Sequence, residues 1–247
     1  MDKNNYFKSF DRKRLTHQRY GERRIMRGLR EQIDTILEVL PQAGAGGLLA
    51  QLADFSKIDP LERAYQDLYG RVGGDFARDQ FQRLTGKSKK AESDWIEYMR
   101  NFAIYESGTR IQQVSQVTLQ RVRRVLEQGV NEGLGTEEIA RRIEDSNAIN
   151  RVRARVIART EIISASNAGA DLGARSTGLN LTKSWLASVD GRERDAHRIA
   201  NDSYQAEPIG MDEDFIVGGE QCKYPGDPNL SAEQVINCRC VHLMEPI

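Results

Sequence analysis

The sequence is poor in cysteine and in long apolar runs. Three cysteines in 247 residues are too few for a disulfide-stapled scaffold, and an odd number fits a reducing compartment. No run approaches the roughly 20 apolar residues that cross a bilayer, and the N-terminal segment MDKNNYFKSFDRKR lacks the apolar core of a signal peptide. We therefore predict a protein that is made and kept in a cytoplasm and has no membrane partner.

The common signatures of enzymes are also missing. No Gly-x-Gly-x-x-Gly follows a predicted strand, and Gly-Lys-Ser at 86–88 lacks the strand and the leading glycine of a phosphate-binding loop. Residue types of phosphodiester-cleaving sites occur at Asp190, Arg192, Arg194 and His197. Their spacing matches no metal or general-base motif. The sequence therefore favours a protein that is not an enzyme; the alternative is a metal-dependent enzyme or toxin that acts on nucleic acid.

Charge is balanced over the whole chain but not along it. The totals are 36 Lys+Arg and 36 Asp+Glu, yet residues 1–30 carry ten bases and three acids, whereas residues 201–247 carry nine acids and two bases. Such an asymmetry predicts two surfaces with different partners. The alternative is two solvated ends that bind nothing.

Apolar residues at steps of three and four predict a long first helix from about Asp11 to Leu40, with Pro41 at its end and a flexible break in the segment PQAGAGG. A second stripe on this helix is basic, so one side can bind an acidic protein surface or the phosphates of double-stranded DNA. The residues of this stripe are Arg19, Arg23, Arg24, Arg27 and Arg30. DNA binding through them would be independent of nucleotide sequence and sensitive to salt.

Further helices are predicted as far as residue 174. They cover 60–72, 76–84, a short segment after Ser93, 109–129, a segment that Thr136 opens, and 147–174. Asp59-Pro60 has the composition of an N-cap followed by a first-turn proline. Small residues at 164–170 would let a neighbouring helix or sheet approach closely.

After Gly178 the pattern changes to that of strands. Strands are predicted at 179–189, 215–217 and 238–244, with Asp190-Gly191 as a hairpin turn and a capping box at Ser231–Gln234 that opens a short helix. The predicted fold is therefore mainly α, with a helical N-terminal block followed by helices that lead into a small α+β C-terminal module. We divide it into a helical leader, 1–105, and a C-terminal domain, 106–247.

The last 60 residues contain all three cysteines and two of the three histidines. Thiolate and imidazole are the ligands that zinc prefers, and a zinc ion can staple a small loop-rich module. The sequence therefore predicts a structural zinc site of His197, Cys222, Cys238 and Cys240. On a strand, however, the two thiols of Cys-x-Cys would point to opposite faces. The alternative is three buried, reduced cysteines without a metal.

Polar residues also interrupt an otherwise small and apolar helix at 159–161. A buried Arg–Glu pair there could bind the polar tip of another segment, such as the loop 190–197. We therefore predict a structural polar cluster of Arg159, Glu161, Asp190, Arg192 and His197. A solvated helical face is the alternative.

Five sequence elements follow one another between Ile111 and Cys240. They are Ile157-Ala158-Arg159-Thr160-Glu161, Asn167, the series Trp185, Asp190, Arg192 and His197, the loop Pro225-Gly226-Asp227-Pro228, and Ile236-Asn237-Cys238-Arg239-Cys240. In this order they resemble the phage head-morphogenesis family, the Mu F-like minor head proteins of tailed bacteriophages. The first 105 residues carry no such resemblance.

The resemblance implies a minor capsid protein in the interior of the virion, assembled in the host cytoplasm. Its partners would be the portal protein and the major capsid or scaffolding protein, and in some members packaged DNA, with which the protein leaves on ejection. The arginine stripe would then contact the portal or the DNA. The family's His and two Cys correspond to His197, Cys238 and Cys240. Because the chain ends seven residues after Cys240, we expect no appended toxin domain of the kind found in some relatives.

Overall fold

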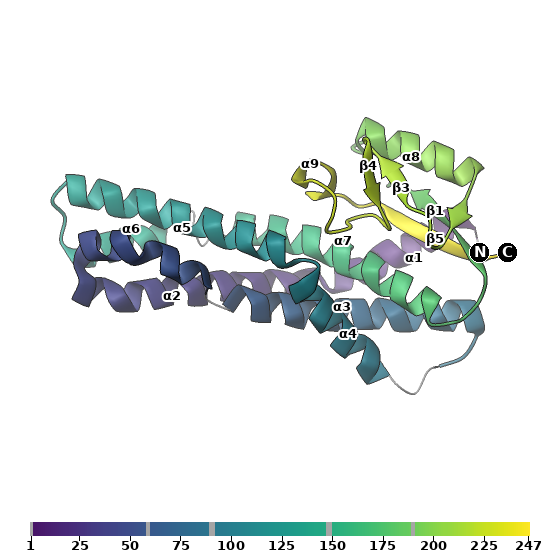
Figure 1. Cartoon of the computed structure of the whole chain (residues 1–247), viewed down its shortest axis with the longest axis horizontal. Helices are drawn as coiled ribbons and strands as arrows, with labels where there is room; N and C mark the ends of the chain where they lie inside the picture. Colours follow the sequence, from purple (N-terminus) through teal and green to yellow (C-terminus); the bar gives the residue numbers. More distant parts are fainter. Residues whose placement is uncertain (1, 58–59, 89–91, 147–149, 189–190) are drawn as a thin grey trace.

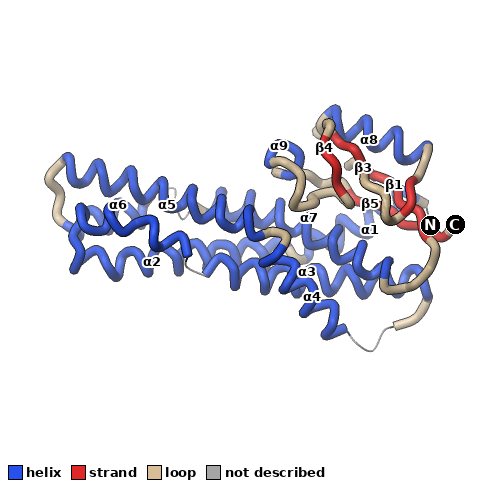
Figure 2. Tube along the Cα trace, in the orientation of Figure 1, coloured by secondary structure: helices blue, strands red, loops and turns tan. Residues whose placement is uncertain are grey.

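The computed structural model describes residues 2–57, 60–88, 92–146, 150–188 and 191–247. Within these ranges, long helices form an elongated bundle, and a small α+β module packs against one end of it, beside both chain termini (Figure 1). All strands lie in that module (Figure 2). The predicted fold, mainly α with a small α+β C-terminal module, is confirmed.

The first two helices are α1 (Lys3–Thr16) and α2 (Gln18–Gln51), and a short 3-10 helix η1 (Leu52–Lys57) follows. Contrary to the prediction, Pro41 does not end the helix, because the helix continues to Gly44. There φ is 63° and ψ is 171°, so two helical segments meet at a kink inside the segment PQAGAGG, where a break was predicted. Leu40 and Leu48 on either side of the bend are both fully buried in one core cluster. Their burial overrides the local preference of proline to end a helix.

The next helices are α3 (Pro60–Thr85) and α4 (Glu92–Tyr105). The two helices predicted at 60–72 and 76–84 are one, because Gly73 and Gly74 lie inside α3 and pack against Met99 and Ile96 of α4. The pair therefore provides space for α4 rather than a break. Asp59, the predicted N-cap, lies outside the described residues.

Helices α5 (Gly108–Asn131) and α6 (Thr136–Asp145) form the end of the bundle far from the termini (Figure 1). They pack on the second half of α2 and on η1 around a separate apolar cluster. Its fully buried members include Ile33, Ile36, Leu48, Val122, Leu126 and Ile143.

Helix α7 (Arg151–Arg175) runs through the middle of the bundle. It begins at Asn150, whose side-chain oxygen accepts hydrogen bonds from the backbone N–H groups of Val152 at 2.6 Å and Arg153 at 3.3 Å. Its small residues are buried, and a Cβ at Gly169 or Gly173 would overlap the backbone of α3. The predicted close approach at this helix is therefore confirmed.

The main sheet has the order β2–β1–β5 and is antiparallel throughout. Its strands are β2 (Ile209–Gly210), β1 (Leu181–Leu186) and β5 (Val241–Pro246), with Trp185 opposite His242. The predicted hairpin at 190–191 does not fit this topology: helix α8 (Asp195–Ala206) follows β1, and Asp190 lies outside the described residues.

A second, two-stranded sheet pairs β3 (Phe215–Val217) with β4 (Glu220–Cys222). Gly218 and Gly219 make the turn, with φ values of 62° and 82°, as a tight two-residue hairpin requires. Short helix α9 (Ala232–Val235) follows, preceded as predicted by Ser231. The Ser231 hydroxyl does not cap it but donates a hydrogen bond to Glu220 at 2.7 Å.

The largest core cluster joins the N-terminal helices to the C-terminal strands. It contains Tyr6 of α1, Leu68 of α3, Ala165 of α7 and Leu243 of β5. The Tyr6 hydroxyl also donates a hydrogen bond to the carbonyl oxygen of His242 at 3.2 Å. The division into 1–105 and 106–247 stays a prediction, and the core is shared across it.

By length and composition alone, one stretch within the helical run Gln18–Thr85 is apolar enough to cross a membrane, although this run includes residues outside the described part. Polar residues interrupt this stretch, so it contains no unbroken apolar run of that length. The core helix of a folded protein passes the same test, so the stretch is weak evidence for a span.

The substitution Gly173→Ala tests the contact between α7 and α3. The new methyl group would overlap the carbonyl group of Ala77, so the helices must separate, and we expect the free energy of unfolding to fall by about 2–3 kcal/mol. The measurement is urea denaturation followed by circular dichroism. The control is Gly46→Ala, where a Cβ meets open space. Equal effects of the two variants would contradict the proposed contact.

Candidate functional site: a buried His-Cys-Cys cluster and an arginine groove

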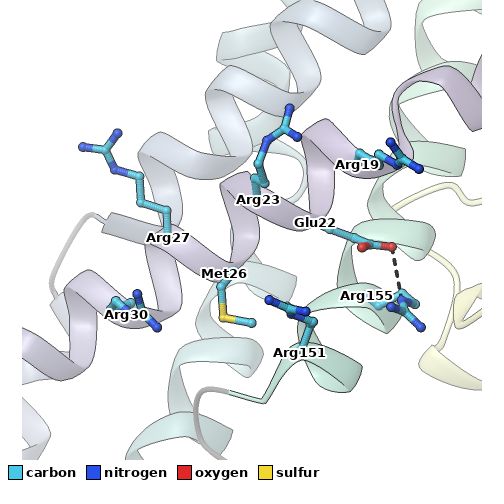
Figure 3. A pocket seen from close by; sticks show the side chains of 9 residues that line it. Arg19, Glu22, Arg23, Met26, Arg27, Arg30, Arg151 and Arg155 are labelled. Carbon is cyan, nitrogen blue, oxygen red and sulfur yellow. Dashed lines mark ion pairs between the residues drawn. The ribbon is translucent and has the colours of Figure 1, made fainter. Parts of the chain in front are cut away.

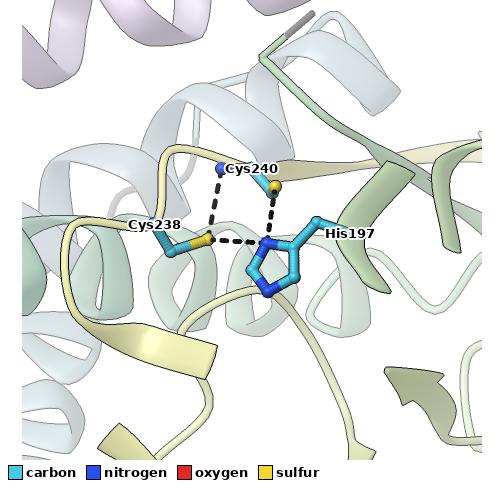
Figure 4. A group of neighbouring side chains, drawn as sticks. All are labelled: His197, Cys238 and Cys240. Carbon is cyan, nitrogen blue, oxygen red and sulfur yellow. Dashed lines mark hydrogen bonds between the residues drawn. The ribbon is translucent and has the colours of Figure 1, made fainter. Parts of the chain in front are cut away.

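A cluster of one histidine and two cysteines lies in the C-terminal module (Figure 4). His197 comes from α8, and Cys238 and Cys240 come from the segment before β5. The imidazole Nδ1 lies 3.3 Å from the Cys240 sulfur and 3.6 Å from the Cys238 sulfur. The three side chains are 2%, 4% and 2% exposed, so the cluster is closed to solvent.

Both thiols of the Cys-x-Cys segment face the same histidine. This contradicts the expectation that they point to opposite faces, because the segment is not part of a strand: β5 begins only at Val241. Asn237 has a left-handed φ of 57°, and the Cys238 N–H donates to the Val235 carbonyl oxygen at 3.0 Å. The chain therefore turns, and the Cys240 N–H donates to the Cys238 sulfur at 3.4 Å.

The orientation of the His197 ring is fixed from its far side. Its Nε2 lies 3.1 Å from Oε1 of Gln234, an oxygen that only accepts hydrogen bonds. In the neutral ring Nε2 therefore carries the proton, and the lone pair of Nδ1 faces the two sulfur atoms. Trp185 packs edge-on against the ring, with centroids 5.6 Å apart.

The two thiols of the cluster differ in acidity. A hydrogen bond from the Cys240 thiol holds the pKa of Cys238 well below its ordinary value. The same hydrogen bond and burial raise the pKa of Cys240. The first thiolate of the pair therefore forms at Cys238.

Cys222 does not join this cluster. It lies on β4 and is buried in the same apolar core, but its sulfur is outside the group formed by the ligand atoms of His197, Cys238 and Cys240. Burial, and next the carboxylate of Asp227, raise the pKa of its thiol. The structure thus brings together three of the four predicted zinc ligands.

The predicted polar cluster is not assembled. Glu161 is buried on the α3 side of α7, where it accepts a 2.6 Å hydrogen bond from the Tyr69 hydroxyl and lies 3.6 Å from the Arg110 guanidinium. Arg159 is exposed, since residues two apart on a helix face different directions. Arg192 is exposed as well, His197 belongs to the cysteine cluster, and Asp190 lies outside the described residues.

Asn167 holds the loops of the C-terminal module on α7. Its buried amide nitrogen donates to the carbonyl oxygens of Pro225 at 2.9 Å, Cys240 at 3.1 Å and Ile163 at 3.2 Å. Its oxygen lies 3.1 Å from Nδ1 of His242. The sequence marked Asn167 only as part of a motif. A buried polar residue within a small-residue helix was the available signal of this role.

The Pro225–Pro228 loop is held by its own aspartate and by α7. Asp227 accepts hydrogen bonds from the backbone N–H groups of Lys223 at 2.7 Å and Asn229 at 2.9 Å. The Ser164 hydroxyl donates to the Gly226 carbonyl oxygen at 2.7 Å. Motif elements that are distant in sequence thus meet at α7, and all of these contacts are structural.

An arginine-lined groove lies between α2 and the first turns of α7 (Figure 3). It is an open hollow of about 670 Å³, and its polar lining residues are Arg19, Glu22, Arg23, Arg27, Arg30, Arg151 and Arg155. The structure therefore adds two arginines from α7 to the predicted stripe. Arg24 does not line this groove and pairs instead with Asp67 at 3.3 Å.

Most of the positive charge in the groove is uncompensated. Arg155 pairs with Glu22 at 3.3 Å, and Arg27 pairs with Glu31 at 2.6 Å. Among the described residues, Arg19, Arg23, Arg30 and Arg151 are exposed and take part in no salt bridge. Arg151 also opens α7, where the helix dipole adds positive potential. The groove is therefore suited to a polyanionic ligand.

The substitution Asn167→Ala tests how the loops are held. It leaves the carbonyl oxygens of Pro225 and Cys240 buried without this donor, so we expect the free energy of unfolding to fall by about 2–4 kcal/mol. Thermal and urea denaturation measure the change. Asn101→Ala, at an exposed position of α4, serves as control and should stay within about 0.5 kcal/mol of the parent. A loss in the control as large as in Asn167→Ala would overturn the assignment.

Comparison with known proteins finds three curated relatives. Minor head protein GP7 of Bacillus phage SPP1 is 33% identical over 119 residues, which are 46% of this chain and 36% of that protein. The uncharacterized protein YqbB of Bacillus subtilis (strain 168) is 31% identical over 119 residues, 47% of this chain and 38% of that protein. The NAD(+)--arginine ADP-ribosyltransferase EFV of Enterococcus faecalis (strain ATCC 700802 / V583) is 32% identical over 115 residues, 45% of this chain and 23% of that protein.

The chain thus matches well under half the length of each relative. No solved structure gives a significant match. The family described as Phage Mu protein F like protein matches residues 120–243, about half of the chain. This match extends from α5 to β5 and includes Asn167, the Pro225–Pro228 loop and the His-Cys-Cys cluster. We conclude that the chain belongs to the family of Phage Mu protein F like proteins.

Proposed function

We propose that the chain is a minor head protein of a tailed phage and acts in head morphogenesis without catalysis. The observation that carries this proposal is the family match, which covers the C-terminal module as far as residue 243 and is accompanied by 33% identity to Minor head protein GP7. In this proposal the chain is assembled in the host cytoplasm and ends in the capsid interior. Its partners are the portal protein and the major capsid or scaffolding protein.

The buried geometry of the module supports a structural role. Asn167 and Asp227 bind backbone groups, and the His-Cys-Cys cluster is closed to solvent. A metal-dependent enzyme or toxin is the competing proposal, and one relative has an enzyme's name, although the match covers only 23% of that protein. The two are separable, because a chelator unfolds a structural site but leaves a catalytic site folded and inactive.

The arginine groove is the contact surface in this proposal. Six arginines and one glutamate line it, and the stripe from Arg19 to Arg30 extends about 16 Å along α2. We infer that it binds either an acidic surface of the portal ring or the phosphates of packaged double-stranded DNA. The acidic C-terminal segment, residues 201–247, would then turn away from the DNA.

Quantitative mass spectrometry of purified phage particles and emptied heads tests the head role. We expect a low, constant copy number in filled particles, since a minor component bound near a portal ring is present only a few to a dozen times. A lower number in emptied heads would mean that the protein leaves with the DNA. Absence from both kinds of particle would contradict a head component and put the enzyme proposal first.

Charge reversal in the groove tests the contact surface. The variant combines Arg23→Glu with Arg30→Glu. Neither substitution breaks a salt bridge of the described residues. The control is Arg124→Glu on the exposed face of α5. If DNA is the ligand, the slope of log affinity against log salt should fall by about two units. If the portal is the ligand, incorporation into heads should fall while DNA retention is unchanged. Unchanged incorporation and unchanged DNA affinity would contradict both.

A further inference from the structure

In the C-terminal module, the segment before β5 contacts helix α8 through polar ligand groups as well as through apolar side chains. Between β4 and β5, residues 223–240 contain only the four-residue helix α9 as regular structure. At the end of this segment, two thiols meet the imidazole of α8, which lies more than 40 residues earlier in the chain. The surrounding side chains are apolar or aromatic, among them Trp185, Phe215 and Val235. A group of one imidazole and two thiols in such an apolar core is typical of a metal site.

The two distances from the imidazole nitrogen to the sulfur atoms are close to those of a tetrahedral site. Zinc lies about 2.0–2.1 Å from imidazole nitrogen and about 2.3 Å from thiolate sulfur, so tetrahedral geometry separates nitrogen and sulfur by about 3.5 Å. The observed separations of 3.3 Å and 3.6 Å lie on either side of that value. All three ligand atoms lie within 4.8 Å of one another. An ion can therefore enter with small side-chain shifts.

Two contacts of neighbouring groups with the cluster favour the binding of a cation. The Gln234 oxygen holds the proton of His197 on Nε2, which leaves Nδ1 free to ligate, as outer partners of metal-binding histidines do. The Cys240 N–H group points at the Cys238 sulfur at 3.4 Å and would stabilise a thiolate there. Two thiolates and a divalent cation would cancel in charge inside the core.

We propose that His197, through Nδ1, and the sulfur atoms of Cys238 and Cys240 bind one zinc ion, which clamps α8 to the segment before β5. Soft sulfur and imidazole ligands select zinc over magnesium or calcium. Binding releases the two thiol protons to solvent. Among the described residues no other His, Cys, Asp or Glu side chain joins the group, so these side chains supply three ligands of the ion.

Cys222 is not a ligand in this proposal. Its sulfur is outside the group of ligand atoms, although it belongs to the same core cluster. The proposed site therefore differs from a four-ligand site, in which Cys222 would be the third cysteine ligand. It also supplies a matched control, since Cys222→Ser replaces a buried thiol in the same core without removing a ligand.

The first experiment measures zinc in the reduced, full-length chain by elemental mass spectrometry, with cobalt substitution as a spectroscopic readout. We expect about one zinc per chain and a cobalt spectrum of two thiolates and one imidazole in tetrahedral geometry. Cys222→Ser should keep the metal, whereas Cys238→Ser and Cys240→Ser should lose it. A folded parent chain that takes up no stoichiometric zinc, or an equal loss in Cys222→Ser, would overturn the proposal.

A second variant avoids the risk that ligand variants misfold. Gln234 is half-buried, and Gln234→Ala removes only the partner of His197 Nε2, so we expect zinc affinity to fall by about 10- to 100-fold in a folded chain. Gln221→Ala on the exposed edge of β4 is the control and should leave the affinity unchanged. Equal affinities of the two variants would contradict the role of Gln234. Zinc binding does not depend on the proposed head role, so the two can fail separately.

Discussion

The close contact between α7 and α3 is the constraint on which the rest of the molecule depends. It exists because Gly169 and Gly173 have no Cβ to keep α7 away from the backbone of α3. The contact makes α7 the central helix of the bundle, and both candidate sites contact it. Its first turns line the arginine groove, while Ser164 and Asn167 further along bind the loops of the C-terminal module.

The spacing of apolar residues predicted most helices, because a helix that buries one face has apolar residues at steps of three and four. It failed where tertiary packing overrides a local signal. Pro41 stays within α2 because apolar residues on both sides of the bend share one core, and the Gly73-Gly74 pair makes room for α4 instead of ending α3. Local preferences cannot reveal such outcomes, since they depend on which helix becomes the neighbour.

Composition and motif order selected His197, Cys238 and Cys240 together, and the structure brings them together. The sequence could not reveal in which direction these side chains point. The turn at Asn237 aims both thiols the same way, and the rotation of α7 buries Glu161 against Arg110 instead of leaving it beside Arg159. The sequence did not predict that Arg151 and Arg155 line the same groove as the arginine stripe, because more than 100 residues separate them from it.

One helix thus carries the groove at its start and the module near its end. From Arg151 to Asn167 the helix rises about 24 Å without a break. A helix of this kind works as a rigid spacer: whatever the groove binds and whatever the module binds are held at a fixed distance and a fixed rotation. In the proposed head role, two partners bound at these places would therefore keep one separation and one orientation relative to each other.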